Sequence, residues 1–124
     1  MELTIDALTF DAADPERLAT FYERLLGWTR TYADEGEIII EAPDGTGIPF
    51  LFLEGHDPKT QKNRIHLDLR PDDQDAAVAA AVDLGASHAD IGQHEDPDVT
   101  WVVLADPEGN ELCILRERDQ PKEP

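Results

Sequence analysis

The sequence predicts an α+β protein in which two βαβββ modules form a cupped mixed β-sheet with the helices on its outer face. The order strand, helix, strand, strand, strand occurs twice, over residues 3–54 and 63–117. Each predicted helix ends in Leu-Gly, at Leu26-Gly27 and at Leu84-Gly85, and each final strand follows a turn containing Pro and Gly. A period of about sixty residues is too long for a solenoid, so duplication of one module explains it better.

The first module has a helix with clear signals at both ends. Residues 3–10 are rich in β-branched and aromatic side chains and predict a strand. Asp14 is placed to cap the helix that follows, Pro15 suits its first position, and Gly27 ends it. The apolar stripe of this amphipathic helix consists of Leu18, Phe21, Tyr22, Leu25 and Leu26. Further strands are predicted at residues 28–32, 37–41 and 48–54.

The second module begins with residues 63–70, which alternate strictly between polar and apolar side chains. The apolar positions are Ile65, Leu67 and Leu69, and the polar positions between them are Arg64, His66 and Asp68. This period of two predicts a half-buried strand whose second face is polar.

The rest of the second module predicts a helix and three strands. The helix covers residues 71–84, and its alanines let it lie close to a sheet, with Val78 and Val82 as the larger contacts. Residues 87–91 predict a weak strand. Residues 99–104 and 112–115 are strand-forming runs around the turn Asp-Pro-Glu-Gly-Asn, which predicts a β-hairpin. In this turn Pro107 presets φ and Gly109 tolerates a positive φ.

Composition excludes several classes of function. The 124 residues suffice for one domain with its own core, which we expect to span residues 1–124. With 28 acidic and 10 basic residues the net charge is -18, which disfavours nucleic acids and anionic membrane surfaces and suits solubility or a salty cytoplasm. A single cysteine, Cys113, excludes an internal disulfide. The sequence has neither a signal-peptide pattern nor about eighteen consecutive apolar residues, so a cytoplasmic location is expected.

Three stretches resemble the vicinal-oxygen-chelate superfamily, also called the glyoxalase and bleomycin-resistance fold. They are residues 14–28 (Asp-Pro…Leu-Leu-Gly-Trp), the strand at 63–68, and residues 104–112 (Leu-Ala-Asp-Pro-Glu-Gly-Asn-Glu-Leu). The resemblance covers nearly the whole chain and is closest to small actinobacterial glyoxalase-like proteins. It implies a cupped sheet, usually in a homodimer, with a small-molecule cavity. It implies no single reaction, because the superfamily includes lyases, isomerases, dioxygenases and non-catalytic drug-sequestering proteins.

The resemblance also implies where a divalent metal would be held. Metal-using relatives take four ligands, typically His or Gln, Glu, His and Glu, from the first, fourth, fifth and eighth strands. Here Ala7 has no donor at the first position, His66 matches the third, and Cys113 stands where Glu is expected. We therefore expect neither a metal nor another cofactor. A metal-bound form would use His66, Glu54 and Cys113.

The side chains expected to bind a small molecule in the cup are Phe50, Phe52, Arg64, His66, Asp68, Trp101 and Cys113. His66 is the candidate for acid–base catalysis, and a structural hydrogen bond with Asp68 is its simpler alternative. Cys113 near a histidine suggests a thiolate nucleophile, but a cysteine in an apolar strand is more often a small buried hydrophobe. For the aromatic residues core packing is an equal alternative, with one of Phe50 and Phe52 expected to face the cup.

Three functions remain open. The sequence favours binding of a small, partly aromatic molecule without the usual divalent metal, because Ala7 removes one ligand. The second is a glyoxalase-type lyase or isomerase with rebuilt metal ligands. The third is non-catalytic sequestration or a structural homodimer, against which the polar face of residues 63–70 argues. The protein is thus left open as an enzyme or a binding protein.

Overall fold

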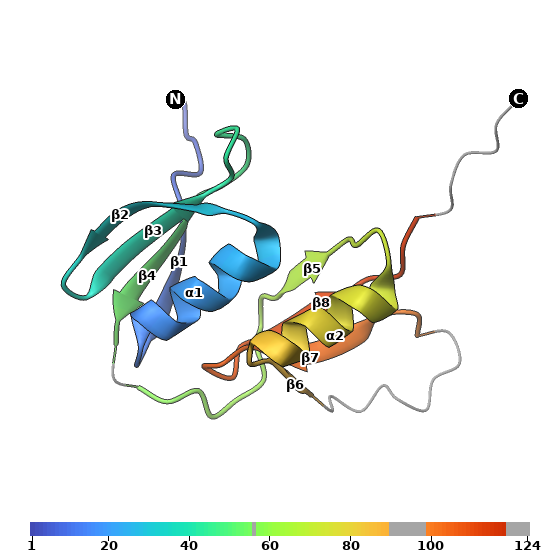
Figure 1. The fold of residues 1–124 in the computed structure, drawn as a ribbon. Coiled ribbons are helices and arrows are strands. Elements are labelled where there is room, and N and C mark those ends of the chain that lie inside the picture. The colour runs from blue at the N-terminus through green and yellow to red at the C-terminus, as the bar shows by residue number, and fades with distance from the viewer. Residues whose placement is uncertain (56, 90–98, 119–124) are drawn as a thin grey trace, which may run out of the picture. The chain divides into compact units, whose positions relative to one another are not determined.

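The computed structural model describes residues 1–55, 57–89 and 99–118. The chain divides into two compact units, unit 1 (Met1–Lys59) and unit 2 (Thr60–Pro124). Each unit has the order βαβββ and contains one four-stranded mixed sheet. Figure 1 labels the helices and strands of both units. The predicted α+β class and the two βαβββ modules are therefore confirmed. Neither helix in the described parts is long and apolar enough to cross a membrane.

Unit 1 consists of β1 (Leu8–Ala12), α1 (Pro15–Leu26), β2 (Thr29–Asp34), β3 (Glu37–Glu41) and β4 (Phe50–Glu54). Its strands are ordered β1-β4-β3-β2, with β1 parallel to β4 and the other pairs antiparallel. The predicted helix ends are confirmed. An Asp14 carboxylate oxygen accepts a hydrogen bond from the Arg17 backbone N–H at 3.1 Å, and Gly27 ends α1 with a φ of 69°.

The sheet face covered by α1 forms the core of unit 1. The Tyr22 ring of α1 lies 5.3 Å from the Phe10 ring, 5.7 Å from Phe50 and 6.0 Å from Phe52, measured between centroids. The expectation that one of Phe50 and Phe52 faces away from the helix is wrong. Residues two apart in a strand share a face, and both rings lie on the helix side, with exposed fractions of 6% and 0%.

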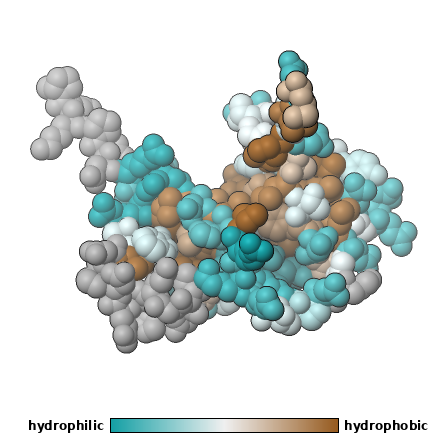
Figure 2. All heavy atoms as spheres, turned by 180° about the vertical axis from the view of Figure 1, so that it is seen from behind, coloured by the Kyte–Doolittle hydropathy of each residue, from teal (hydrophilic) through white to brown (hydrophobic). Residues whose placement is uncertain are grey.

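The opposite face of this sheet is also apolar. Leu51 and Leu53 of β4 and Ile39 of β3 point to it, because side chains alternate along a strand, and each is half-buried. Figure 2 shows hydrophobic side chains gathered on the unit that carries the N-terminus, bordered by hydrophilic ones. Unit 1 therefore carries apolar side chains on both faces of its sheet, and its own helix covers one of them.

The first strand begins later than its composition predicts. β1 pairs with β4 only from Leu8 onward, and the preceding Leu3 and Ile5 are 83% and 73% exposed. Strand-forming residues need a hydrogen-bonded neighbour as well as a suitable composition. The predicted strand from residue 3 is thus corrected to Leu8–Ala12.

Unit 2 consists of β5 (Leu67–Leu69), α2 (Gln74–Leu84), β6 (Ser87–His88), β7 (Val102–Ala105) and β8 (Glu111–Ile114). Its strands are ordered β5-β8-β7-β6, with β5 parallel to β8. The hairpin of β7 and β8 confirms the prediction, and Gly109 in its turn has a φ of 88°. Of the strand predicted at 87–91, residues 90 and 91 lie outside the described residues.

The strand predicted over residues 63–70 is shorter in the structure. Arg64 and Ile65 form a bend before β5, and Ile65 is 82% exposed instead of buried. The strict alternation therefore holds only from Leu67 to Leu69, where β8 supplies the pairing.

α2 packs through its small residues. An Asp73 carboxylate oxygen caps it by accepting from the Ala76 backbone N–H at 3.1 Å, and Ala81 is fully buried. The Gln74 side chain ties the first turn to the end of β8, donating to the Ile114 carbonyl at 3.1 Å. Val82, expected as a large contact with the sheet, is 41% exposed. Neighbouring residues of a helix point in different directions, and the buried direction belongs to Ala81.

Candidate functional site

Strands β5 and β8 bring Asp68 and Cys113 next to each other. The parallel register pairs Leu67 with Leu112, Asp68 with Cys113, and Leu69 with Ile114. Since side chains alternate along a strand, Asp68 and Cys113 share one face and the four apolar partners share the other. The apolar face is the one beside α2, because Val102, which pairs with Ile114, lines a groove together with Val78 and Val82 of α2. Asp68 and Cys113 therefore lie on the face that α2 leaves uncovered.

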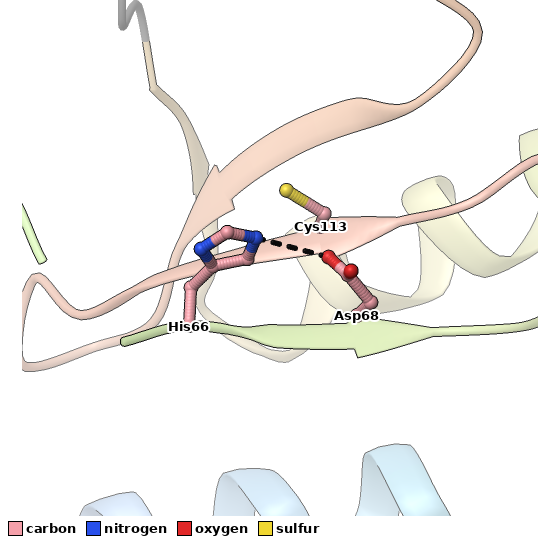
Figure 3. A group of neighbouring side chains, drawn as sticks. All are labelled: His66, Asp68 and Cys113. Atoms are coloured by element: carbon pink, nitrogen blue, oxygen red, sulfur yellow. Dashed lines mark ion pairs between the residues drawn. The ribbon is translucent and has the colours of Figure 1, made fainter. Parts of the chain in front are cut away.

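His66 completes a group of three polar side chains on this face. Its Nε2 lies 3.1 Å from Oδ1 of Asp68. One potential ligand atom from each of His66, Asp68 and Cys113 lies within 4.8 Å of the other two. Figure 3 shows these three side chains next to one another. The side chains of His66 and Asp68 are 42% and 53% exposed, whereas Cys113 is 5% exposed. Two accessible polar groups thus stand beside a buried thiol.

The segment that carries His66 is fastened to the start of β8. The backbone N–H of Asn63 donates to the Glu111 carboxylate at 3.2 and 3.3 Å. The Asn63 side-chain amide donates to the carbonyl oxygens of Ile65 at 3.1 Å and Glu111 at 3.3 Å. Sequence reasoning missed both residues, and the only available signal was the preference of asparagine for turns. These bonds hold the bend that leads His66 toward Asp68.

Burial raises the pKa of the Cys113 thiol, and the negative charge of Asp68 and hydrogen bonding to it raise that pKa further. The positive charge of Lys62 opposes the shift. The thiol therefore stays protonated near neutral pH, and a thiolate nucleophile needs a lowered pKa. The surroundings of Cys113 favour the buried-thiol alternative over the nucleophile.

We expect Cys113 in the folded, metal-free protein to be alkylated slowly by iodoacetamide. The reaction rate follows the thiolate fraction, so a raised pKa moves the rate profile to higher pH than in the urea-unfolded chain. Asp68→Asn removes a negative charge and should move the profile back toward lower pH. Rates measured between pH 7 and 10 test this. A folded protein that is alkylated as fast as the unfolded one at pH 7.5 would contradict the assigned environment.

The other expected site residues lie on other elements of the two units. Arg64 lies in the exposed bend before β5, so the expectation that it shares a face with His66 and Asp68 through strand alternation is wrong. Trp101 immediately precedes β7 and is half-buried. Phe50 and Phe52 lie in the core of unit 1, and Glu54 is exposed at the end of β4 in the same unit. The cluster of possible metal ligands in unit 2 consists of His66, Asp68 and Cys113. The sequence had suggested Glu54 as the ligand beside His66 and Cys113.

The donor set of the superfamily's usual metal site does not fit these residues. Ala7 has no side-chain donor, and Cys113 offers a sulfur where a carboxylate oxygen would serve a hard ion. Sulfur ligands suit zinc and similar ions, and carboxylate and water suit manganese or magnesium. We therefore derive no chemistry through a hard divalent ion at this position.

Two βαβββ units, with polar side chains gathered on the strands β5 and β8, define the glyoxalase-like class of proteins. A family model described as "Glyoxalase-like domain" matches residues 7–115, and the chain belongs to this family. A search of curated proteins found no match.

Solved structures share the fold at low sequence identity. A point mutant of FosX from Listeria monocytogenes, a fosfomycin resistance protein, complexed with Mn(II) and 1S,2S-dihydroxypropylphosphonic acid, has a TM-score of 0.71 and 15% identity, covering 95% of this chain and 93% of that chain. A glyoxalase/bleomycin resistance protein/dioxygenase family enzyme from Burkholderia phytofirmans has a TM-score of 0.67 and 16% identity, and the match covers 90% of this chain and 97% of that chain. TnmS3, an antibiotic binding protein from Streptomyces, has a TM-score of 0.63 and 21% identity, and the match covers 95% of this chain and 99% of that chain. Identities at this level show the fold alone.

Proposed function

We propose that the protein binds a small, partly aromatic organic molecule through His66 and Asp68, without the superfamily's usual divalent metal. The observation that carries this proposal is the pair itself. His66 Nε2 and Asp68 Oδ1 lie 3.1 Å apart on the sheet face that α2 leaves uncovered, and both side chains are accessible. An accessible imidazole and carboxylate offer a donor and acceptors to the polar end of a ligand.

The pair suggests a role for the imidazole. A proton on Nε2 of His66 would face Asp68, because an ionised carboxylate only accepts hydrogen bonds. In neutral His66 the other ring nitrogen, Nδ1, is then the acceptor, which can take a hydrogen bond or a proton from a ligand. This supports the second candidate function, a glyoxalase-type lyase or isomerase in which His66 performs acid–base chemistry.

The structural neighbours support a small-molecule ligand. FosX is complexed with a phosphonic acid, and TnmS3 is described as an antibiotic binding protein. By analogy with the family we propose a homodimer in the cytoplasm as the working state. Light scattering coupled to size-exclusion chromatography, with an expected mass twice the 13.8 kDa of the chain, tests the dimer.

His66→Ala should weaken ligand binding roughly tenfold or more, the worth of one hydrogen bond to a charged or polar partner. The ligand is first sought by a thermal-shift screen of aromatic and α-oxo compounds in the presence of EDTA. Because His66 is 42% exposed and lies outside the core, the melting temperature should stay nearly unchanged. His88→Ala is the matched control, since His88 is an exposed histidine of β6 that lines the groove beside α2.

Two outcomes would contradict this proposal. A large fall in melting temperature for His66→Ala with unchanged affinity would make the pair a structural network. Ligand binding that disappears in EDTA and returns with Mn(II) would establish the metal-dependent alternative. Protein purified without a chelator should contain less than one divalent ion per chain.

A further inference from the structure

We propose that His66, Asp68 and Cys113 form a site within unit 2 that takes up one thiophilic divalent ion of the zinc or cobalt type when the ion is supplied. This inference goes beyond the proposed function, because binding of the organic ligand does not require the ion. It also differs from the donor set that the superfamily resemblance implies. All three ligands belong to one unit, Asp68 is among them, and Glu54 of the other unit is not.

The present distances are close to those of a coordinated ion. A tetrahedral zinc ion, with Zn–S near 2.3 Å and Zn–N or Zn–O near 2.0–2.1 Å, holds its donor atoms about 3.3–3.6 Å apart. The His66 and Asp68 donors are 3.1 Å apart, and every pair among the three lies within 4.8 Å. The remaining closure requires only side-chain rotation, for which the exposed His66 and Asp68 have room, whereas the buried Cys113 gives the site a fixed point.

Paired strands hold two of these donors, and the third lies directly before one of these strands. Asp68 and Cys113 are direct partners in the parallel register of β5 and β8, so their side chains project side by side from one face. His66 comes two residues before Asp68, and the bonds between Asn63 and Glu111 hold its segment against β8. Sites built on paired strands place their ligands more accurately than sites built on loops.

The donor types select the ion. Imidazole, carboxylate and thiolate together suit zinc and cobalt, and the sulfur disfavours magnesium and manganese. On coordination the Cys113 S–H bond breaks, the sulfur keeps the electron pair and forms the bond to the ion, and the proton passes to the buffer. Three protein ligands leave a fourth position for water or for a polar group of a ligand. A three-ligand site of this kind binds more weakly than a closed four-ligand site, so the ion should not be retained in full during purification.

The test is a Co²⁺ titration of the full-length, chelator-stripped protein, followed by absorption spectroscopy in the absence of organic ligand. We expect one equivalent that produces a sulfur-to-cobalt charge-transfer band in the near ultraviolet, together with visible bands of tetrahedral cobalt. Cys113→Ser should abolish the charge-transfer band. Asp68→Asn, at a position that is 53% exposed, should keep the fold and weaken binding at least tenfold. Glu54→Gln is the control and should leave the titration unchanged.

Three results would overturn the site. Cobalt that binds without a charge-transfer band would place it on the surface carboxylates of this acidic chain. If Glu54→Gln weakened cobalt binding as much as Asp68→Asn does, Glu54 would be a ligand, as the superfamily resemblance implies, and the ligands would not all come from unit 2. Several weak equivalents that Asp68→Asn does not affect would exclude a defined site. Binding of the organic ligand is measured in EDTA, and cobalt binding is measured without the organic ligand. The failure of one proposal can therefore be told apart from the failure of the other.

Discussion

Phe52→Ala should lower the free energy of unfolding by about 4 kcal/mol, which is typical of deleting a fully buried phenylalanine ring. Phe52 is 0% exposed, and its ring centroid lies 5.1 Å from that of Phe10, 6.0 Å from Tyr22 and 6.4 Å from Phe50. Alanine would leave a cavity between α1 and the sheet, lined by rings that cannot easily collapse into it. The loss should therefore lie near the upper end of the range for core substitutions.

Urea unfolding followed by tryptophan fluorescence tests this expectation in unit 1. In a Trp101→Phe background, Trp28 is the remaining tryptophan, and its ring lies 4.9 Å from that of Phe50. Tyr32→Ala is the matched control, because Tyr32 is an aromatic residue of the same sheet that is 44% exposed, and its deletion should change stability little. Equal losses for the two variants would mean that Phe52 does not lie in the core.

Local signals in the sequence were sufficient for the helices. Asp14 and Gly27 set the ends of α1 through bonds to residues within one turn, so each end follows from a few neighbouring letters. The same holds for Asp73 and Gly85 at the ends of α2. A capping signal depends on nothing distant in the chain, and α1 was therefore predicted to the residue, as was the C-terminal end of α2. The predicted start of α2 at residue 71 is corrected to Gln74, because Asp73 caps the helix.

Strand lengths depended on distant partners and were predicted less well. Leu3, Ile5 and Ile65 have the composition of strand residues, yet all three lie outside the strands because no paired strand extends to them in the described structure. Composition reports the preference of a residue, whereas pairing is decided by segments tens of residues away. This difference also explains why Arg64 does not continue the polar face of β5.

The candidate site depends both on local signals in the sequence and on the pairing of distant strands. His66, Asp68 and Cys113 could each be named from the sequence as polar or reactive residues in predicted strands. That Asp68 lies opposite Cys113 follows only from the register of β5 on β8, which joins segments 45 residues apart (113 − 68 = 45). A shift of that register by one residue would turn Cys113 toward α2, so that it would no longer share a face with Asp68. The group therefore depends on whatever fixes the start of β8.

The turn between β7 and β8 fixes this start through Asp106, a residue that is only 3% exposed. Its Oδ1 accepts the backbone N–H of Glu108 at 2.9 Å and of Asn110 at 3.0 Å, and the Asn110 side-chain amide donates to Oδ2 at 3.0 Å. Asp106→Ala would leave these donors without the carboxylate. We expect a loss of about 3 kcal/mol, since bonds to a charged acceptor are each worth roughly 1.5–3 kcal/mol and water can replace part of them.

The loss should appear in urea unfolding of unit 2, with Trp101 as the reporter in a Trp28→Phe background. Asp44→Ala is the control, because Asp44 accepts from the Thr46 N–H and hydroxyl in the corresponding turn of unit 1 but is exposed, so its removal should cost much less. Asp106→Asn keeps one carbonyl acceptor and should restore part of the stability. If the turn holds the register, Asp106→Ala should also speed the alkylation of Cys113, because β8 opens more often. Unchanged alkylation at reduced stability would instead confine the role of Asp106 to the turn.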